Sequence, residues 1–114
     1  MYQVFRNMTV EMSRQQEAIE MITSARDRLN GEHGGHYGVS VAVGGDPTAV
    51  TLSSPFQTLG QYEAMRMAVM QDAELQSIIR NSGGIITSVQ DTIAQIIKPP
   101  GPRSTFAGVN VAMM

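Results

Sequence analysis

The sequence predicts an α+β fold in which four antiparallel strands carry two helices on one face. Apolar and polar residues alternate with period two in three segments, and apolar residues recur at helical spacing in two others. Turns rich in Gly, Asp, Asn, Pro and Ser separate these segments. A chain of 114 residues is enough for one domain with a single core.

The first expected element is a strand over residues 2–12. One apolar face collects Tyr2, Val4, Met8, Val10 and Met12, and the opposite parity carries Gln3, Asn7, Thr9 and Glu11. Arg6 interrupts the apolar face and Phe5 interrupts the polar one. This pattern is typical of a strand with one side against a core.

A helix over roughly residues 14–30 follows. Ser13 and Gln16 have the spacing of a capping box at its start. The apolar stripe consists of Ala18, Ile22, Ala25 and Leu29, assisted by Ile19 and Met21. Asn30-Gly31 tolerates positive φ and is expected to end the helix.

Two short strands then predict an antiparallel hairpin. They cover residues 37–43 and 48–54, and the turn Gly44-Gly45-Asp46-Pro47 joins them. Small residues occupy one face of both strands, so a partner sheet or a ligand can approach that face closely. Pro55 is expected to end the second strand.

The second helix is expected to begin at a capping box formed by Thr58 and Gln61. Its inner stripe comprises Tyr62, Met65, Val69, Leu75, Ile78 and Ile79. Asp72 is a good cap and predicts a break within this helix. The run Asn81-Ser82-Gly83-Gly84 is expected to stop it.

Residues 86–97 are ambiguous in the sequence. Their apolar residues fit a helical stripe, but residues 91–97 also fit a strand with Ile93 and Ile97 pointing inward. The isoleucine content and the place in the element order favour the strand. The proline-rich connector that follows divides the chain into a compact domain, 1–98, and a connector with a C-terminal arm, 99–114.

The expected order is strand, helix, strand, strand, helix, strand, which is that of a ferredoxin-like split unit. Both helices then cover one face of the sheet, and the other face stays open. An open face of small residues predicts dimerisation with a second copy of the chain. The arm alternates again from Phe106 to Met114, and it is expected to add a strand to a sheet edge of its own chain or of the partner.

Composition and charge exclude several classes of function. The absence of Cys excludes disulfides, thiolate nucleophiles and Cys-ligated metals. No apolar run is long enough to span a bilayer, and the amino terminus has no signal-peptide core, so a cytoplasmic protein is expected. The 8 basic residues are scattered and the net charge is −2, which argues against nucleic-acid binding. The glycine pairs lack the spacing of a phosphate loop, and no cofactor is predicted.

Two segments resemble a known family. The run Pro55-Phe-Gln-Thr-Leu-Gly-Gln-Tyr-Glu-Ala64, followed by Met70-Gln-Asp-Ala-Glu-Leu-Gln76, is similar to the second helix of dimeric α+β barrel proteins. The similar groups are the antibiotic-biosynthesis monooxygenases and the NIPSNAP-like proteins. The resemblance extends over residues 2–98 in element order and is specific over 55–80.

This resemblance implies that two ferredoxin-like subunits face their sheets together into a barrel. It also implies pockets between sheet and helices or inside the barrel. Haem-degrading members use an Asn on the first strand, a Trp, and a His near the second helix. Asn7 matches by position, but the chain has no Trp and both His precede residue 37, so haem degradation is not implied.

His33 and His36 are the first candidates for chemistry. With Glu32 beside them, the two imidazoles suggest a divalent metal site, and His36 alone could act as a general base at a pocket. No third metal ligand is evident, so a solvated helix–strand loop is the favoured interpretation.

Arg6, Tyr62 and Arg66 are candidates for ligand binding. Arg6 on an apolar face either anchors an anionic ligand or, as we favour, pairs with a helix carboxylate such as Glu63. Tyr62 and Arg66 lie one turn apart and could contact a ligand oxygen. The favoured alternative places Tyr62 in the core and Arg66 in solvent.

Two functions follow from these patterns. The favoured one is a homodimeric barrel that binds a small apolar molecule or has a structural role. The alternative is a cofactor-independent, monooxygenase-like enzyme acting on an apolar or aromatic substrate, positioned by Arg6, Asn7 and His36. The first is favoured because no pair of residues forms an evident proton-transfer arrangement.

Overall fold

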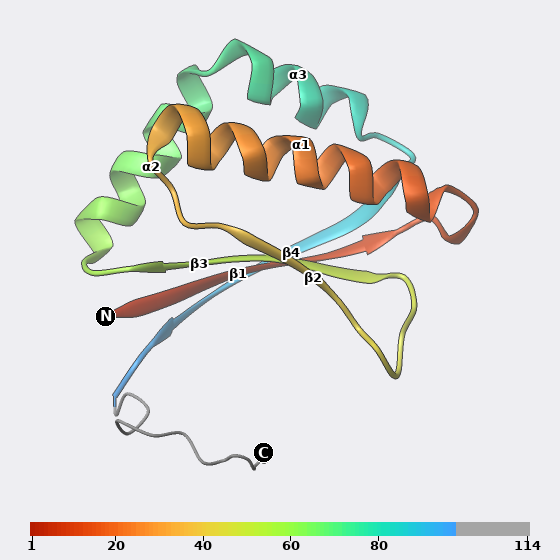
Figure 1. Cartoon of the computed structure of the whole chain (residues 1–114), viewed down its shortest axis with the longest axis horizontal. Helices are drawn as coiled ribbons and strands as arrows, with labels where there is room; N and C mark the ends of the chain where they lie inside the picture. Colours follow the sequence, from red (N-terminus) through yellow and green to blue (C-terminus); the bar gives the residue numbers. More distant parts are fainter. Residues whose placement is uncertain (98–114) are drawn as a thin grey trace.

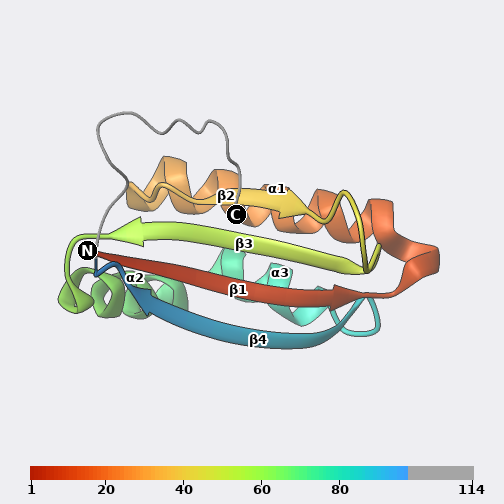
Figure 2. The same ribbon diagram turned by 90° about the horizontal axis from the view of Figure 1, so that it is seen from below.

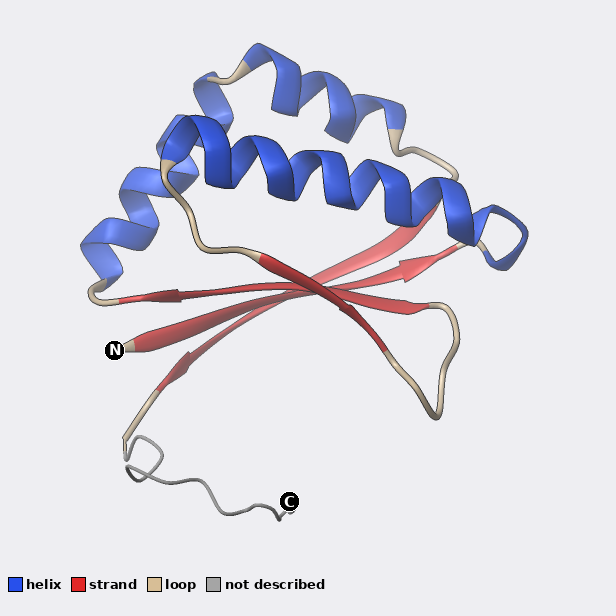
Figure 3. Cartoon of the chain, viewed as in Figure 1, coloured by secondary structure: helices blue, strands red, loops and turns tan. Residues whose placement is uncertain are grey.

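The computed structural model describes residues 1–97, so the predicted C-terminal arm lies outside the described residues. The strands are β1 (Tyr2–Val10), β2 (Gly38–Val41), β3 (Ala49–Phe56) and β4 (Ile86–Gln95). The helices are α1 (Gln15–His33), α2 (Leu59–Gln71) and α3 (Ala73–Asn81), with a 3-10 turn at Met12–Arg14. Figure 3 separates the helices from the strands by colour.

The four strands form one antiparallel sheet in the order β2-β3-β1-β4. This is the ferredoxin-like order, and it confirms the predicted fold class. All three helices lie over the same face of the sheet (Figure 1). Seen from below, the opposite face has no helix in front of it (Figure 2).

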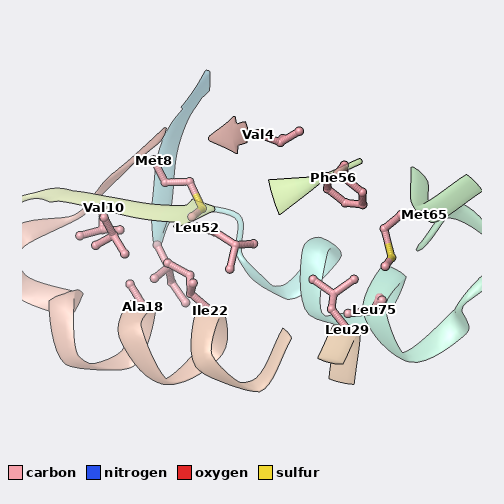
Figure 4. Packing of buried hydrophobic residues seen from close by; sticks show 12 residues of the cluster. Val4, Met8, Val10, Ala18, Ile22, Leu29, Leu52, Phe56, Met65 and Leu75 are labelled. Carbon is pink, nitrogen blue, oxygen red and sulfur yellow. The ribbon is translucent and has the colours of Figure 1, made fainter. Parts of the chain in front are cut away.

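Strand register assigns each side chain to a face. The alternation on β1 sends Val4, Met8 and Val10 toward the helices, where all three are buried. On this side of the sheet they pack mainly against side chains of β3 and α1 (Figure 4). The buried core consists of Val4, Met8, Val10, Ala18, Ile22, Leu29, Val50, Leu52, Phe56, Met65, Leu75 and Ile85.

The ambiguous segment is a strand. β4 begins at Ile86, earlier than the sequence indicates, and pairs with β1 along almost its whole length. Val4 lies opposite Ile93 and Met8 opposite Val89, so from Val89 onward the odd-numbered residues of β4 face the helices. Val89 and Ile93 nevertheless remain about half exposed, at 53% and 45%, because β4 is the edge strand.

Helix α1 begins and ends differently from the prediction. The hydroxyl of Ser13 donates to Glu11 Oε1 at 3.3 Å, so it does not cap α1. The helix continues past Asn30 to His33, and the Asn30 side chain bonds to the backbone of Tyr37. It ends at Gly34, whose φ of 67° suits a residue without Cβ.

The second helical region is two helices, as Asp72 predicts. Thr58 Oγ1 accepts the Gln61 N–H at 3.1 Å and caps α2. Asp72 has an extended backbone and accepts the Glu74 and Leu75 N–H groups, which starts α3. The predicted stop after Asn81 is also observed.

Pro55 does not end β3, which continues to Phe56. The last pair between β2 and β3 joins Gly38 and Ser53. At Pro55 the strand therefore has β1 as its only neighbour, and a missing N–H is tolerated on the unpaired side. Within residues 1–97, no helix is long and apolar enough to cross a membrane.

Candidate functional site

A cavity of about 280 Å³, here called the sheet–helix cavity, lies between the sheet and the helices. A smaller hollow of about 120 Å³, the annex, shares Arg6, Ala25, Leu52 and Ile79 with it. Most of the lining is apolar. The polar and aromatic lining residues of the sheet–helix cavity are Arg6, Tyr37, Tyr62, Arg66, Gln76 and Asp91.

Arg6 forms a two-point ion pair across the sheet. Its Nε donates to Asp91 Oδ1 at 2.8 Å, and its Nη2 donates to Oδ2 at 2.9 Å. β1 and β4 create this pair because Arg6 lies directly opposite Asp91 in the register. The hydrogen bond from Arg6 lowers the pKa of Asp91, and the same bond raises the pKa of Arg6, so both stay ionised at neutral pH.

The expected partner of Arg6 was therefore wrong. Glu63 lies on α2 and accepts a hydrogen bond from Arg66 Nη1 at 3.0 Å. Asp91 is 85 residues from Arg6 in the sequence. Helical and strand periodicity show which face a residue occupies, but they do not show which distant residue lies opposite it. The interpretation of Arg6 as a paired charge is correct, but its partner lies on a strand.

Two tyrosines form one wall of the cavity. Phe56 packs edge-to-face between them, with ring centroids 6.2 Å from Tyr37 and 5.5 Å from Tyr62. Asn30 fixes the backbone of Tyr37, accepting its N–H at 2.8 Å and donating to its carbonyl at 3.0 Å. Burial raises the pKa of Tyr37 to about 12, so its hydroxyl keeps its proton at neutral pH.

Arg66 lies at the outer rim of the cavity. Its guanidinium carbon is 5.9 Å from the centroid of the Tyr62 ring, within the range of a cation–π contact. Its side chain is 57% exposed, and Tyr62 is partly buried. The predicted shared face of Tyr62 and Arg66 is therefore real, and Arg66 both meets solvent and lines the cavity.

Arg6, Tyr62 and Arg66, all chosen from sequence, thus line one cavity. Asn7 does not join them, because it lies on the opposite face of the sheet, where its Oδ1 accepts the Thr51 hydroxyl at 3.0 Å. His36 is exposed in the loop after α1 and lines a different cavity. Arg6, Asn7 and His36 therefore cannot hold one substrate within a single chain.

A second cavity, of about 540 Å³, lies beside the loop that follows α1, and both histidines line it. His33 is bonded through Nε2 to Asp72 Oδ2 at 2.7 Å. It is the last residue of α1 and partly buried, so the prediction of a solvated loop position is wrong for His33. Among residues 1–97, no three His, Asp or Glu side chains are grouped as metal ligands would be.

Asp72 connects α1 to the start of α3. Its carboxylate accepts hydrogen bonds from His33, from Arg28 Nε at 2.9 Å, and from the backbone of α3. The bond from His33 lowers its pKa most, and Leu75 N–H and Arg28 lower it further. The cap at Asp72 was predictable, whereas its bonds to α1, 39 and 44 residues away, were not.

The sheet–helix cavity is equipped to bind and poorly equipped for proton transfer. Within the described chain, the hydroxyls of Tyr37 and Tyr62 and the Nη1 group of Arg6 have no hydrogen bond to another residue. These three groups can donate to a ligand oxygen. Both carboxylate oxygens of Asp91 are bonded to Arg6, and the phenol of Tyr37, with a pKa of about 12, keeps its proton at neutral pH and cannot accept another.

The comparison with solved structures identifies the fold. A NIPSNAP family protein from Agrobacterium tumefaciens has a TM-score of 0.73 and 16% identity, over 90% of this chain and 100% of that chain. The fold is that of the NIPSNAP and antibiotic biosynthesis monooxygenase proteins. The predicted resemblance is therefore confirmed as a likeness of fold.

Proteins assigned to the monooxygenase group match over similar lengths. One from Nitrosomonas europaea has a TM-score of 0.69 and 13% identity, over 86% of this chain and 100% of that chain. One from Deinococcus radiodurans has a TM-score of 0.67 and 14% identity, over 100% of this chain and 99% of that chain. No family model matches the sequence, and no curated protein matches it.

Proposed function

We propose that the protein binds a small, mostly apolar molecule in the sheet–helix cavity and does not transform it. The observation that carries this proposal is that three unused hydrogen-bond donors line one cavity whose lining is mostly apolar. Ligand sites commonly combine an apolar lining with a few placed polar groups, as here. The polar end of the ligand would lie near Arg6 and the tyrosines, and its apolar part would extend into the annex.

The size of the cavity limits the ligand. Its volume of about 280 Å³, with the adjoining 120 Å³, lies at the lower end of the range for small-molecule sites. A compact molecule of one or two rings, or a short acyl chain, suits this space better than an extended one. Met65 and Met70 add adaptable walls.

The monooxygenase-like alternative is less well supported. It requires a group that takes or donates a proton at the substrate, whereas the carboxylate of Asp91 is bonded to Arg6 and the phenol of Tyr37 keeps its proton at neutral pH. The likeness to both structural groups concerns the fold, on which unrelated activities occur. Binding without catalysis therefore requires only the hydrogen-bond donors and the apolar lining that the described residues provide.

Filling the cavity should abolish binding. Ala25 lines both the sheet–helix cavity and the annex, so we expect Ala25→Leu to weaken binding of 2-acetonaphthone, a neutral two-ring ketone, by about tenfold or more. Titration followed by ligand-observed NMR measures this. The matched control is Ala64→Leu, which places the same side chain in the second cavity.

The control should bind the ketone as the wild type does, and circular dichroism should show both variants folded. Equal binding by Ala25→Leu and the wild type would place the ligand elsewhere. Failure of the wild-type protein to bind the ketone or any neutral ring compound of that size would count against the proposed function.

We also propose that the chain forms a homodimer through the open face of its sheet. Among the described strand residues, Phe5 is the one large apolar side chain on that face, and its neighbours on β3 and β4 are small or polar, such as Ser53 and Thr92. Small side chains let a second sheet approach closely, and Phe5 gives the contact an apolar centre.

A cytoplasmic location remains a prediction that cell fractionation can check.

The C-terminal arm is proposed to add a strand across this dimer. β2 and β4 are the two edges of the sheet, and each has a strand on one side only. Removing residues 103–114 should weaken the dimer by about tenfold, because added strand pairing would be lost. Sedimentation equilibrium at several concentrations measures the dissociation constant. An unchanged constant would exclude arm exchange and leave the sheet-to-sheet contact standing.

A further inference from the structure

We propose that Asp91 makes the sheet–helix cavity selective for neutral ligands with a hydrogen-bond-accepting oxygen, such as a ketone or an amide, and against carboxylates. This inference rests on the proposed binding function and names the chemical class of its ligand. It assigns to Asp91 the role of a specificity-determining residue.

The charges around the cavity are already matched. In the described part of the chain, the charged side chains that line it are Arg6, Arg66 and Asp91. Arg6 is held by Asp91 at two points, and Arg66 is paired with Glu63. Each arginine at the cavity therefore already has a carboxylate partner, so neither positive charge is left to balance an anionic ligand.

The position of Asp91 determines which ligands can bind well to Arg6. A ligand oxygen that reaches Arg6 must take an N–H that Asp91 leaves free, on Nη1 or the second N–H of Nη2, because Nε and one N–H of Nη2 are bonded to Asp91. A ligand carboxylate there would share one guanidinium with a second carboxylate a few ångströms away. Repulsion between like charges at that separation should weaken its binding by about tenfold or more.

The same donors suit a neutral oxygen. A carbonyl oxygen has two lone pairs and can accept from Arg6 Nη1 and from one tyrosine hydroxyl at once. Burial keeps the hydroxyl of Tyr37 protonated, so it offers a donor throughout the neutral pH range. A neutral acceptor gains these bonds without repulsion from Asp91.

Asp91 is a practical residue to change. It lies on the edge strand β4, and its side chain is 39% exposed. Asn has the same shape, keeps one acceptor for Arg6 and removes the negative charge. Because the pair is substantially exposed, Asp91→Asn should leave the fold intact.

The experiment compares two probes of equal shape, 2-acetonaphthone and 2-naphthoate, at pH 7.5. The wild type should bind the ketone about tenfold or more tightly than the carboxylate. Asp91→Asn should bind 2-naphthoate about tenfold more tightly than the wild type does and leave ketone binding within about threefold. Asp27→Asn is the matched control, since it removes the same charge at an exposed site on α1 and should behave as the wild type.

The possible outcomes separate this inference from the proposed function. If wild-type protein binds 2-naphthoate as tightly as the ketone, Asp91 does not select, while the binding site stands. If Asp91→Asn leaves the ratio of the two affinities unchanged, the inference is overturned in the same way. If neither probe binds the wild type, the proposed function fails and this inference fails with it. The wild-type ratio decides the matter even if the variant does not fold.

Discussion

Replacing Asp72 by Ala should destabilise the protein more than removing the cap of the preceding helix at Thr58. The change removes the cap of α3 and the acceptor for both His33 and Arg28. Thr58→Ala removes only the cap of α2, which typically lowers the free energy of unfolding by about 1 kcal/mol. We expect the loss at Asp72 to be about twice that at Thr58 or more, because His33 loses its partner and Arg28 keeps only its bond to Glu74.

Urea unfolding of both variants measures this comparison. Asp72→Asn is the conservative control, since Asn is also a good cap and should recover much of the loss. A smaller effect for Asp72→Ala than for Thr58→Ala would show that the bonds from α1 contribute nothing to stability.

The same residue predicts how stability depends on pH. The pKa of Asp72 in the folded protein lies below its ordinary value of 3.8. The unfolded chain therefore binds the proton more tightly, and stability falls as the pH drops below about 5 toward the folded pKa. Asp72→Asn should flatten this part of the profile, while Asp27→Asn, on the exposed side of α1, should leave it unchanged.

Replacing Phe5 by Asp should dissociate the proposed dimer. Phe5 lies on β1, which has β3 on one side and β4 on the other, so it occupies the middle of the open face. A buried charge at the centre of an interface removes an apolar anchor and leaves a desolvated carboxylate. Losses of this kind commonly exceed 2 kcal/mol, so the dissociation constant should rise about 30-fold or more.

Sedimentation velocity over a range of concentrations measures the change. Val43→Asp is the matched control, because Val43 is fully exposed in the turn between β2 and β3 and should not affect the dimer. A wild-type protein that stays monomeric at high concentration would contradict the proposed dimer. Chemical-denaturation curves of Phe5→Asp should separate loss of association from loss of folding.

Local patterns predicted the architecture well. Alternation placed Val4, Met8 and Val10 on one face, which is the helix side, and the break in that alternation marked Arg6 as a candidate site residue. Helical spacing likewise paired Tyr62 with Arg66. Such patterns repeat every two to four residues, so they report which face a side chain occupies.

The partners of these residues could not be predicted in the same way. The Arg6–Asp91 pair depends on the register between the first and last strands, and the bond of His33 to Asp72 depends on how α1 crosses the junction of α2 and α3. Tyr37 was expected only as the start of a strand, and its place in the cavity wall depends on its bonds with Asn30, near the end of α1. In the first two cases a contact between segments far apart in the sequence decides the role.

The pairing of β1 with β4 has a consequence during synthesis. Among the described elements β1 is made first and β4 last, so β1 has both its edges paired only after the other elements have been made. Until then Arg6 has no Asp91, and the cavity lacks the part of its wall that Asp91 forms. The capacity to bind a ligand is therefore acquired only once β4 has been synthesised, and a chaperone or ligand present earlier would meet an incomplete site.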